Sequence, residues 1–142
     1  MGFSLARRTN SKDREGYSGY TRSQAWSWRR QRWFRDCRQK GREPACQVCS
    51  LTLESNGTLD LHHLSYDGVQ KDPGGGWLSR ESDEDLMPFC RNHHEALHRT
   101  LDDHRRDYWG WSRRRATVVV AASLRRKYES ATLAEIEREE RQ

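Results

Sequence analysis

The sequence lacks long hydrophobic runs. Its longest apolar run covers residues 118–122, whereas a membrane-spanning helix needs about 20 apolar residues. The first residues contain no apolar stretch of the kind that marks a secretory signal, so we expect a cytoplasmic protein without a membrane partner. Apolar residues make up only 33% of the 142-residue chain, and the mean hydropathy is −1.16. With so little core-forming material, we expect a cross-link to stabilise the fold.

Cysteine is also scarce, with four residues in the chain. Disulfides are disfavoured in a reducing cytoplasm, so metal binding or burial in a core is the expected role. Cys46 and Cys49 form a CxxC pair, and Cys90 and His93 form a CxxH pair after 40 intervening residues. Three thiolates and one imidazole at this spacing suit a tetrahedral structural Zn²⁺. Cys37 in place of His93 is the alternative fourth ligand.

Lysine is rare among the basic residues, since 22 of the 26 are arginine. The charge is unevenly placed: residues 1–42 carry a net charge of +9, residues 43–98 of −7, residues 99–127 of +6 and residues 128–142 of −3. Arginine favours bidentate contacts with phosphate. A polyanion such as nucleic acid is therefore the expected partner of the two basic segments. A solvated arginine-rich surface is the alternative interpretation.

A helix is predicted from an N-cap at Ser23 to about Lys40. Apolar residues at positions 26, 33, 34 and 37 make one stripe along it, as expected for a helix that buries one face. Trp28 lies off this stripe and is expected to be exposed. Residues 1–22 are polar and basic, and we expect them to form a flexible arm.

The rest of the chain is predicted to contain short strands followed by helices. Alternating apolar residues predict a strand within residues 58–64, and Asn56-Gly57 before it is a hairpin-turn signal. The glycine-rich segment 67–84 is expected to be a linker. We further expect a return strand at residues 86–89 and helices at residues 92–102, 113–128 and 133–140. The last helix would begin with a capping box formed by Thr132 and Glu135.

Five of the six histidines lie in two clusters. His94 and His98 are four residues apart and therefore project from one face of the predicted helix. His62 and His63 are neighbours on the predicted strand, so their side chains point to opposite sides. One of the strand histidines is then expected to join His94 and His98 on a metal ion, which leaves the other for a different role.

The order of these motifs resembles that of the HNH endonucleases, in particular the zinc-containing kind common in bacteria and their phages. The resemblance covers roughly residues 20–100 and rests on the CxxC pair, the His62-His63-Leu64 segment and the segment from Asp85 to His98. It implies a mostly helical α+β fold with a ββα-metal core, a structural zinc site and flanking basic helices. The nuclease domain is expected at residues 23–102, between the arm of residues 1–22 and a helical C-terminal extension of residues 103–142.

The resemblance also implies an activity, the hydrolysis of phosphodiester bonds in DNA, and a role for each site residue. His63 matches the general base that activates water, and Asp85 takes the position of the asparagine that orients this base. The ligands of the catalytic ion match His62, His94 and His98. We expect Mg²⁺ or Mn²⁺ there, although imidazole ligands also accept Zn²⁺ or Ni²⁺. The structural zinc positions match Cys46, Cys49, Cys90 and His93.

The partner implied is double-stranded DNA, whose backbone the basic segments would hold on either side of the site. The arginines expected to make these contacts are Arg29, Arg30, Arg32, Arg35, Arg105, Arg106, Arg113, Arg114 and Arg115. One alternative is a zinc-stapled nucleic-acid-binding module whose histidine cluster is inactive. Another is an adaptor that binds a protein partner through its helical tail.

Overall fold

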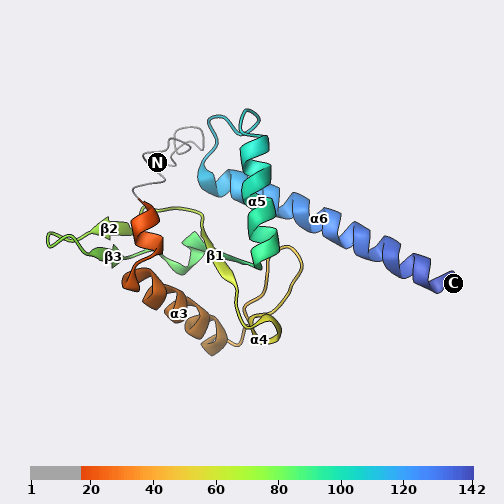
Figure 1. Ribbon diagram of the computed structural model, residues 1–142, viewed down its shortest axis with the longest axis horizontal. Coiled ribbons are helices and arrows are strands. Elements are labelled where there is room, and N and C mark those ends of the chain that lie inside the picture. The colour runs from red at the N-terminus through yellow and green to blue at the C-terminus, as the bar shows by residue number, and fades with distance from the viewer. Residues whose placement is uncertain (1–16) are drawn as a thin grey trace.

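The computed structural model describes residues 17–142, which form a mostly helical α+β fold (Figure 1). The helices are α3 (Gln24–Gln39), α4 (Leu53–Asn56), α5 (Arg91–Asp103) and α6 (Arg113–Glu140), and a 3₁₀ turn, η1, covers Asp83–Asp85. One antiparallel pair consists of β1 (Asp60–His63) and β4 (Leu86–Phe89), and a second of β2 (Val69–Lys71) and β3 (Trp77–Ser79). Within residues 17–142, no helix combines the length and the apolar character needed to cross a bilayer.

The β1–β4 pair lies at the centre of the fold, and α5 packs against both of its strands. The two strands are in register with His62 opposite Met87 and His63 opposite Leu86. Both strands and the helix predicted after them are confirmed. Leu59, Phe89 and the α5 leucines are buried together with the inner face of α6, so the main core joins the strands to both C-terminal helices.

Helix α3 begins and ends as predicted. The Ser23 side chain accepts a hydrogen bond from the Trp26 backbone N–H, 3.2 Å away, and Lys40 is the C-cap. Trp26 is buried, whereas Trp28 is 63% exposed, as its place off the apolar stripe predicts. The buried face of α3 packs in a second cluster with Leu61 of β1 and neighbouring aromatic residues, which fixes α3 against the first strand.

Residues 17–22 are part of the fold, which corrects the prediction of an arm reaching to residue 22. Residues 17–21 form a helical turn, and Tyr20 is fully buried. Its ring packs against Trp26 and Trp77, with ring centroids 5.5 Å apart in both cases. Burying this aromatic ring offsets part of the entropy lost by ordering one turn of chain. The rest of the expected arm, residues 1–16, lies outside the described residues.

Residues 67–84 form a hairpin rather than a linker. Strands β2 and β3 pair from Val69 opposite Ser79 to Lys71 opposite Trp77. In the turn between them, the Asp72 side chain accepts hydrogen bonds from two glycine backbone N–H groups, at residues 74 and 76. The glycines therefore form a tight turn instead of a flexible connection. The hairpin lies beside the N-terminal part of α3 (Figure 1).

The Asn56-Gly57 pair ends a helix and does not turn a hairpin. Gly57 has a φ of 81° and is the C-cap of the short helix α4, where its backbone N–H bonds the carbonyl of Leu53. A left-handed residue is needed both in hairpin turns and at helix ends, and glycine supplies it in either setting. The Asn56-Gly57 signal therefore predicts the left-handed backbone correctly but assigns it to a hairpin turn instead of a helix end.

The C-terminal tail is one continuous helix, α6, instead of the two predicted. Ser112 caps its N-terminus, and the Thr132 hydroxyl bonds the Tyr128 carbonyl within the helix, so no capping box interrupts it. The valine run costs only tenths of a kcal/mol per residue in helix propensity, and Val120 is buried against the core. Every residue from Arg125 onward is exposed. Beyond Tyr128, whose ring lies 5.7 Å from that of His93, α6 extends away from the rest of the fold (Figure 1).

Candidate functional site

The two predicted zinc-binding pairs meet in the structure. Cys46 and Cys49 lie in the loop after α3, and Cys90 and His93 lie at the start of α5. All four ligand atoms fall within 4.8 Å of one another. The Cys49 and Cys90 sulfurs are 3.9 Å apart, and His93 Nδ1 is 3.3 Å from the Cys90 sulfur. Sulfurs bound to zinc at about 2.3 Å in a tetrahedron are about 3.8 Å apart, so the cluster is compatible with a structural metal site. Cys37 is not part of it, which removes the alternative fourth ligand.

The thiols of this site have shifted acidities. Burial raises the pKa of the Cys49 thiol to about 11. At Cys46, burial is outweighed by backbone N–H donors, one of them from Val48 at 3.4 Å from the sulfur, and the pKa is lowered. A cation bound here would displace protons from the thiols, as zinc does when it binds cysteine.

A second group of ligand atoms comes from one strand residue and two residues of α5. Nδ1 of His62 is 3.3 Å from Nε2 of His94, which is 3.1 Å from Nε2 of His98. These three nitrogens converge within 4.8 Å, as expected from a strand residue facing one turn of helix. Burial lowers the pKa of His62 well below its ordinary value, and the ring is therefore neutral at pH 7. The structure thus brings together the three residues predicted to hold a catalytic ion.

The outward nitrogens of two of these rings are held by neighbouring residues. His94 Nδ1 lies 3.0 Å from an Asp60 carboxylate oxygen, which only accepts, so Nδ1 carries the proton. His62 Nε2 lies 3.1 Å from the Thr117 hydroxyl. Asp60 thus directs the lone pair of His94 Nε2 at the cluster, and the Thr117 hydroxyl, which can accept as well as donate, is compatible with a lone pair on His62 Nδ1. This is the arrangement that metal-binding histidines require. The donor set therefore fits a divalent cation.

His63 occupies the opposite face of β1, as the alternation of the strand predicts. Its ring stacks on Tyr66 with centroids 4.3 Å apart and lies 4.5 Å from the Trp26 ring. Its backbone carbonyl accepts a 2.6 Å hydrogen bond from Nε of Arg113. Burial lowers the pKa of His63, although the neighbouring Glu81 carboxylate opposes the shift. The ring is thus held on two sides and is neutral at pH 7.

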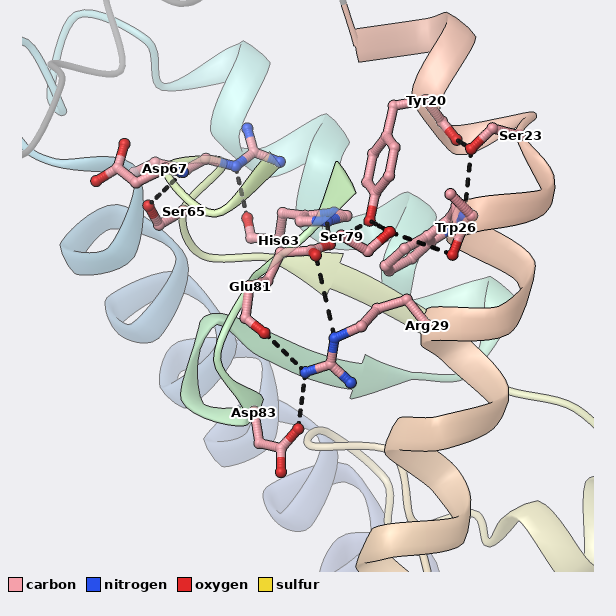
Figure 2. Close-up of polar contacts among 12 residues, drawn as sticks. Tyr20, Ser23, Trp26, Arg29, His63, Ser65, Asp67, Ser79, Glu81 and Asp83 are labelled. Carbon is pink, nitrogen blue, oxygen red and sulfur yellow. Dashed lines mark hydrogen bonds and ion pairs between the residues drawn. The ribbon is translucent and has the colours of Figure 1, made fainter. Parts of the chain in front are cut away.

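The carboxylate on His63 belongs to Glu81 and not to Asp85. Glu81 Oε2 lies 2.9 Å from His63 Nε2 (Figure 2), whereas the Asp85 side chain pairs with Arg114. The register explains this: Leu86 is opposite His63, so Asp85, one residue earlier, is directed to the other face. This corrects the geometry on which the expected orienting role of Asp85 depends.

Glu81 is not among the predicted site residues, because it lies in the segment 67–84, which the sequence indicates to be a linker. Two signals were present. Asp72-Pro73 followed by glycines is typical of a tight turn, and the alternate positions Trp77, Ser79 and Glu81 share one face of β3 and its extension. All three contact Tyr20, by ring packing or by hydrogen-bond distance. The hairpin thus carries Glu81 to the site.

A cleft of about 650 Å³ connects the two histidine faces. Both strand histidines, His94 and His98 line it, together with Trp26 and Tyr66. Four arginines also line it: Arg22, Arg30, Arg91 and Arg113. Two of these, Arg30 and Arg113, were predicted to contact DNA, and the other two were not singled out. One carboxylate, that of Asp60, also lines the cleft and pairs with Arg91. Because the arginines outnumber it, the local potential is positive and an anionic ligand is favoured in this cleft.

The remaining predicted DNA-contact arginines differ in their surroundings. Arg29 is 2% exposed and bonds Asp83 at 2.7 Å, so it is a buried structural residue and is not available to DNA. Arg114 pairs with Asp85, and Arg115 lies 3.8 Å from the centre of the Trp111 ring. The other four are exposed, two on α3 and two in the loop after α5: Arg32, Arg35, Arg105 and Arg106.

No protein-family description, curated protein or solved structure matches this chain.

Proposed function

We propose that the protein is a metal-dependent endonuclease of the HNH type, which hydrolyses phosphodiester bonds of DNA. One observation carries the proposal: the two adjacent histidines of β1 point to opposite faces of the strand, and both line the same cleft. His62 points to the group that includes His94 and His98, while His63 lines the same cleft without joining that group. A binding module has no need of a neutral, buried histidine beside a separate metal-ligand set.

In this mechanism, His63 accepts a proton from the attacking water. Nε2 is occupied by Glu81, and among residues 17–142 no hydrogen bond is made to Nδ1, so Nδ1 is the basic atom. A ring that is neutral at pH 7 is ready to take a proton. The outward nitrogens of His94 and His62 stay on Asp60 and Thr117, which keeps these two rings aimed at the cluster throughout the reaction.

The ion expected at the histidine cluster is Mg²⁺ or Mn²⁺, with Zn²⁺ or Ni²⁺ also acceptable to imidazole ligands; when bound, it supplies Lewis-acid stabilisation of the phosphoryl group and the leaving oxygen. The β1–β4 pair and α5 would then be the ββα-metal core of the fold. A zinc ion in the Cys46–His93 site would hold the start of α5, the helix that carries two of the ligands.

The proposed substrate is DNA, expected in duplex form. The cleft arginines include Arg30 and Arg113, one on each side of the strand histidines in the chain. The exposed arginines of α3 and of the loop after α5 extend the positive surface. Since a phosphodiester backbone is bound chiefly through such charges, binding should weaken steeply with salt.

The test is plasmid nicking by the zinc-loaded full chain, with and without added Mg²⁺ or Mn²⁺, beside two histidine variants. We expect ion-dependent nicking that His63→Ala reduces by at least about 100-fold. His104→Ala is the matched control, because His104 is exposed and, within residues 17–142, its side chain pairs with Asp107 alone, and it should cut like the parent. If neither the parent nor the control cuts while both bind DNA, the nuclease proposal fails, and a zinc-stapled binding module replaces it.

A further inference from the structure

Glu81 is a carboxylate in an unusual place. Its side chain has no solvent exposure, and an unpaired charge so deep in a protein is strongly disfavoured. It nevertheless stays ionised, because hydrogen bonds from His63 and Tyr20 outweigh burial and lower the pKa of Glu81 below its ordinary value. The residue is held at the back of the proposed general base, away from the metal-ligand cluster.

Tyr20 and Arg29 fix the position of this carboxylate (Figure 2). The Tyr20 hydroxyl donates a 2.5 Å hydrogen bond to Oε2, the same oxygen that faces His63. Arg29 donates through Nη2 to the Glu81 backbone carbonyl at 3.0 Å, and its Nε lies 4.0 Å from Oε1. Arg29 thus holds the Glu81 backbone and Tyr20 holds its carboxylate, which keeps Oε2 against the imidazole.

An ionised carboxylate only accepts hydrogen bonds, so its contact with His63 requires the proton to be on Nε2. The lone pair is then on Nδ1, at the other side of the ring. We propose that Glu81 is the positioning residue of the general base, which fixes the orientation of His63 and holds it in the Nε2–H tautomer; this rests on the proposed nuclease function. Tyr20 and Arg29 act one step further back, by holding Glu81.

Glutamine at this position would reverse the hydrogen-bond pattern. Nε and Nη1 of Arg29 are buried donors without a hydrogen-bond partner among residues 17–142. An amide oxygen is therefore drawn to the guanidinium side, which turns the amide NH₂ group toward His63 and Tyr20. The Tyr20 hydroxyl then donates to Ser79 Oγ, 2.9 Å away, instead of to residue 81. A donor facing Nε2 requires a lone pair on that atom and moves the proton to Nδ1, where it blocks proton abstraction from water.

The experiment measures the tautomer and the nicking rate of the zinc-loaded full chain side by side. Nitrogen-15 NMR of the ring, at pH 7.5 without added Mg²⁺, reports which nitrogen of His63 is protonated. We expect the Nε2–H form in the parent and the Nδ1–H form in Glu81→Gln. We also expect the nicking rate of Glu81→Gln to fall by about 10- to 100-fold, with DNA affinity unchanged. Glu84→Gln, an exposed carboxylate three residues away, is the matched control and should behave like the parent.

Each possible result of these two measurements either supports or overturns the positioning role of Glu81. An Nδ1–H tautomer in the parent overturns the proposal even if Glu81→Gln fails to fold. If the parent cuts and Glu81→Gln cuts equally, the positioning role is refuted while the nuclease function stands. A larger loss with Asp85→Asn than with Glu81→Gln would return the orienting role to Asp85. If the parent does not cut, the proposed function fails, and the NMR result alone decides whether Glu81 sets the tautomer.

Discussion

Removing the Tyr20 hydroxyl tests the buried network without changing the shape of the core. Tyr20→Phe deletes one donor and leaves the ring, which packs against Trp26 and Trp77. The lost hydrogen bond is 2.5 Å long and reaches a carboxylate with no solvent exposure. Burial and the Glu81 hydrogen bond raise the pKa of Tyr20 well above 10, so the hydroxyl is a permanent donor at working pH.

The expected loss follows from these contacts. A hydrogen bond to a charged group contributes about 1.5–3 kcal/mol, and no water can replace the donor at a buried site. The Oε2 atom keeps its bond from His63, which places the expected loss near the middle of this range. We therefore expect Tyr20→Phe to lower the free energy of unfolding by about 2 kcal/mol.

The assay is urea denaturation at pH 7.5 with saturating zinc, so that metal loss does not enter the comparison. Tyr128→Phe, on the exposed part of α6, is the matched control and should change stability by less than about 0.5 kcal/mol. A loss with Tyr20→Phe as small as that of the control would refute the reasoning. Tyr20 would then not be docked on Glu81, and residues 17–22 would behave as the arm that the sequence predicts.

Three further perturbations have defined outcomes. A Cβ at Gly68 would collide with the backbone of Arg80 and Glu81, so Gly68→Ala should reduce both stability and nicking, measured by urea denaturation and plasmid assay. Removal of the ion from the Cys₃His cluster by a strong chelator should abolish the cooperative thermal transition, and added zinc should restore it, because structural zinc contributes on the order of 10 kcal/mol. Burial lowers the pKa values of His62 and His63, so below a pH of about 6.5 the unfolded chain binds more protons than the folded one. Protein kept in saturating zinc, without added Mg²⁺ or Mn²⁺, should therefore lose stability as the pH falls from 7.5 to 5.5, and equal urea midpoints at the two pH values would contradict this.

The parts of the fold that the sequence predicted correctly are those determined by short-range geometry. Ser23 caps α3 because its side chain reaches a backbone N–H only three residues away. His94 and His98 meet because helix periodicity places residues four apart on one face. The Cys₃His cluster follows from a similar rule, since the CxxC and CxxH pairs each fix two ligands locally and the fold has only to bring the two pairs together.

The parts that were missed depend on contacts between distant segments. Tyr20 docks on Glu81, 61 residues away in the chain, and neither residue stands out in its own neighbourhood. Arg29 lies in the same arginine-rich stretch as the exposed arginines of α3, yet it is buried. Its contacts are with Glu81 and Asp83, which lie more than 50 positions later in the chain. A composition-based prediction cannot separate an arginine that meets phosphate from one that meets a buried carboxylate.

The buried Arg29–Glu81 pair is a costly element for a protein with so little apolar material. Apolar residues of similar volume at such sites are often neutral or stabilising, and two Arg29 nitrogens and one Glu81 oxygen lack hydrogen-bond partners among residues 17–142. Stability is therefore a poor explanation for this pair. An apolar side chain at position 81 would leave His63 free to adopt either tautomer, whereas a fixed carboxylate permits only one. This cost is accounted for if the network serves to orient the His63 imidazole. That role joins the N-terminal turn, the hairpin and β1 in one functional unit.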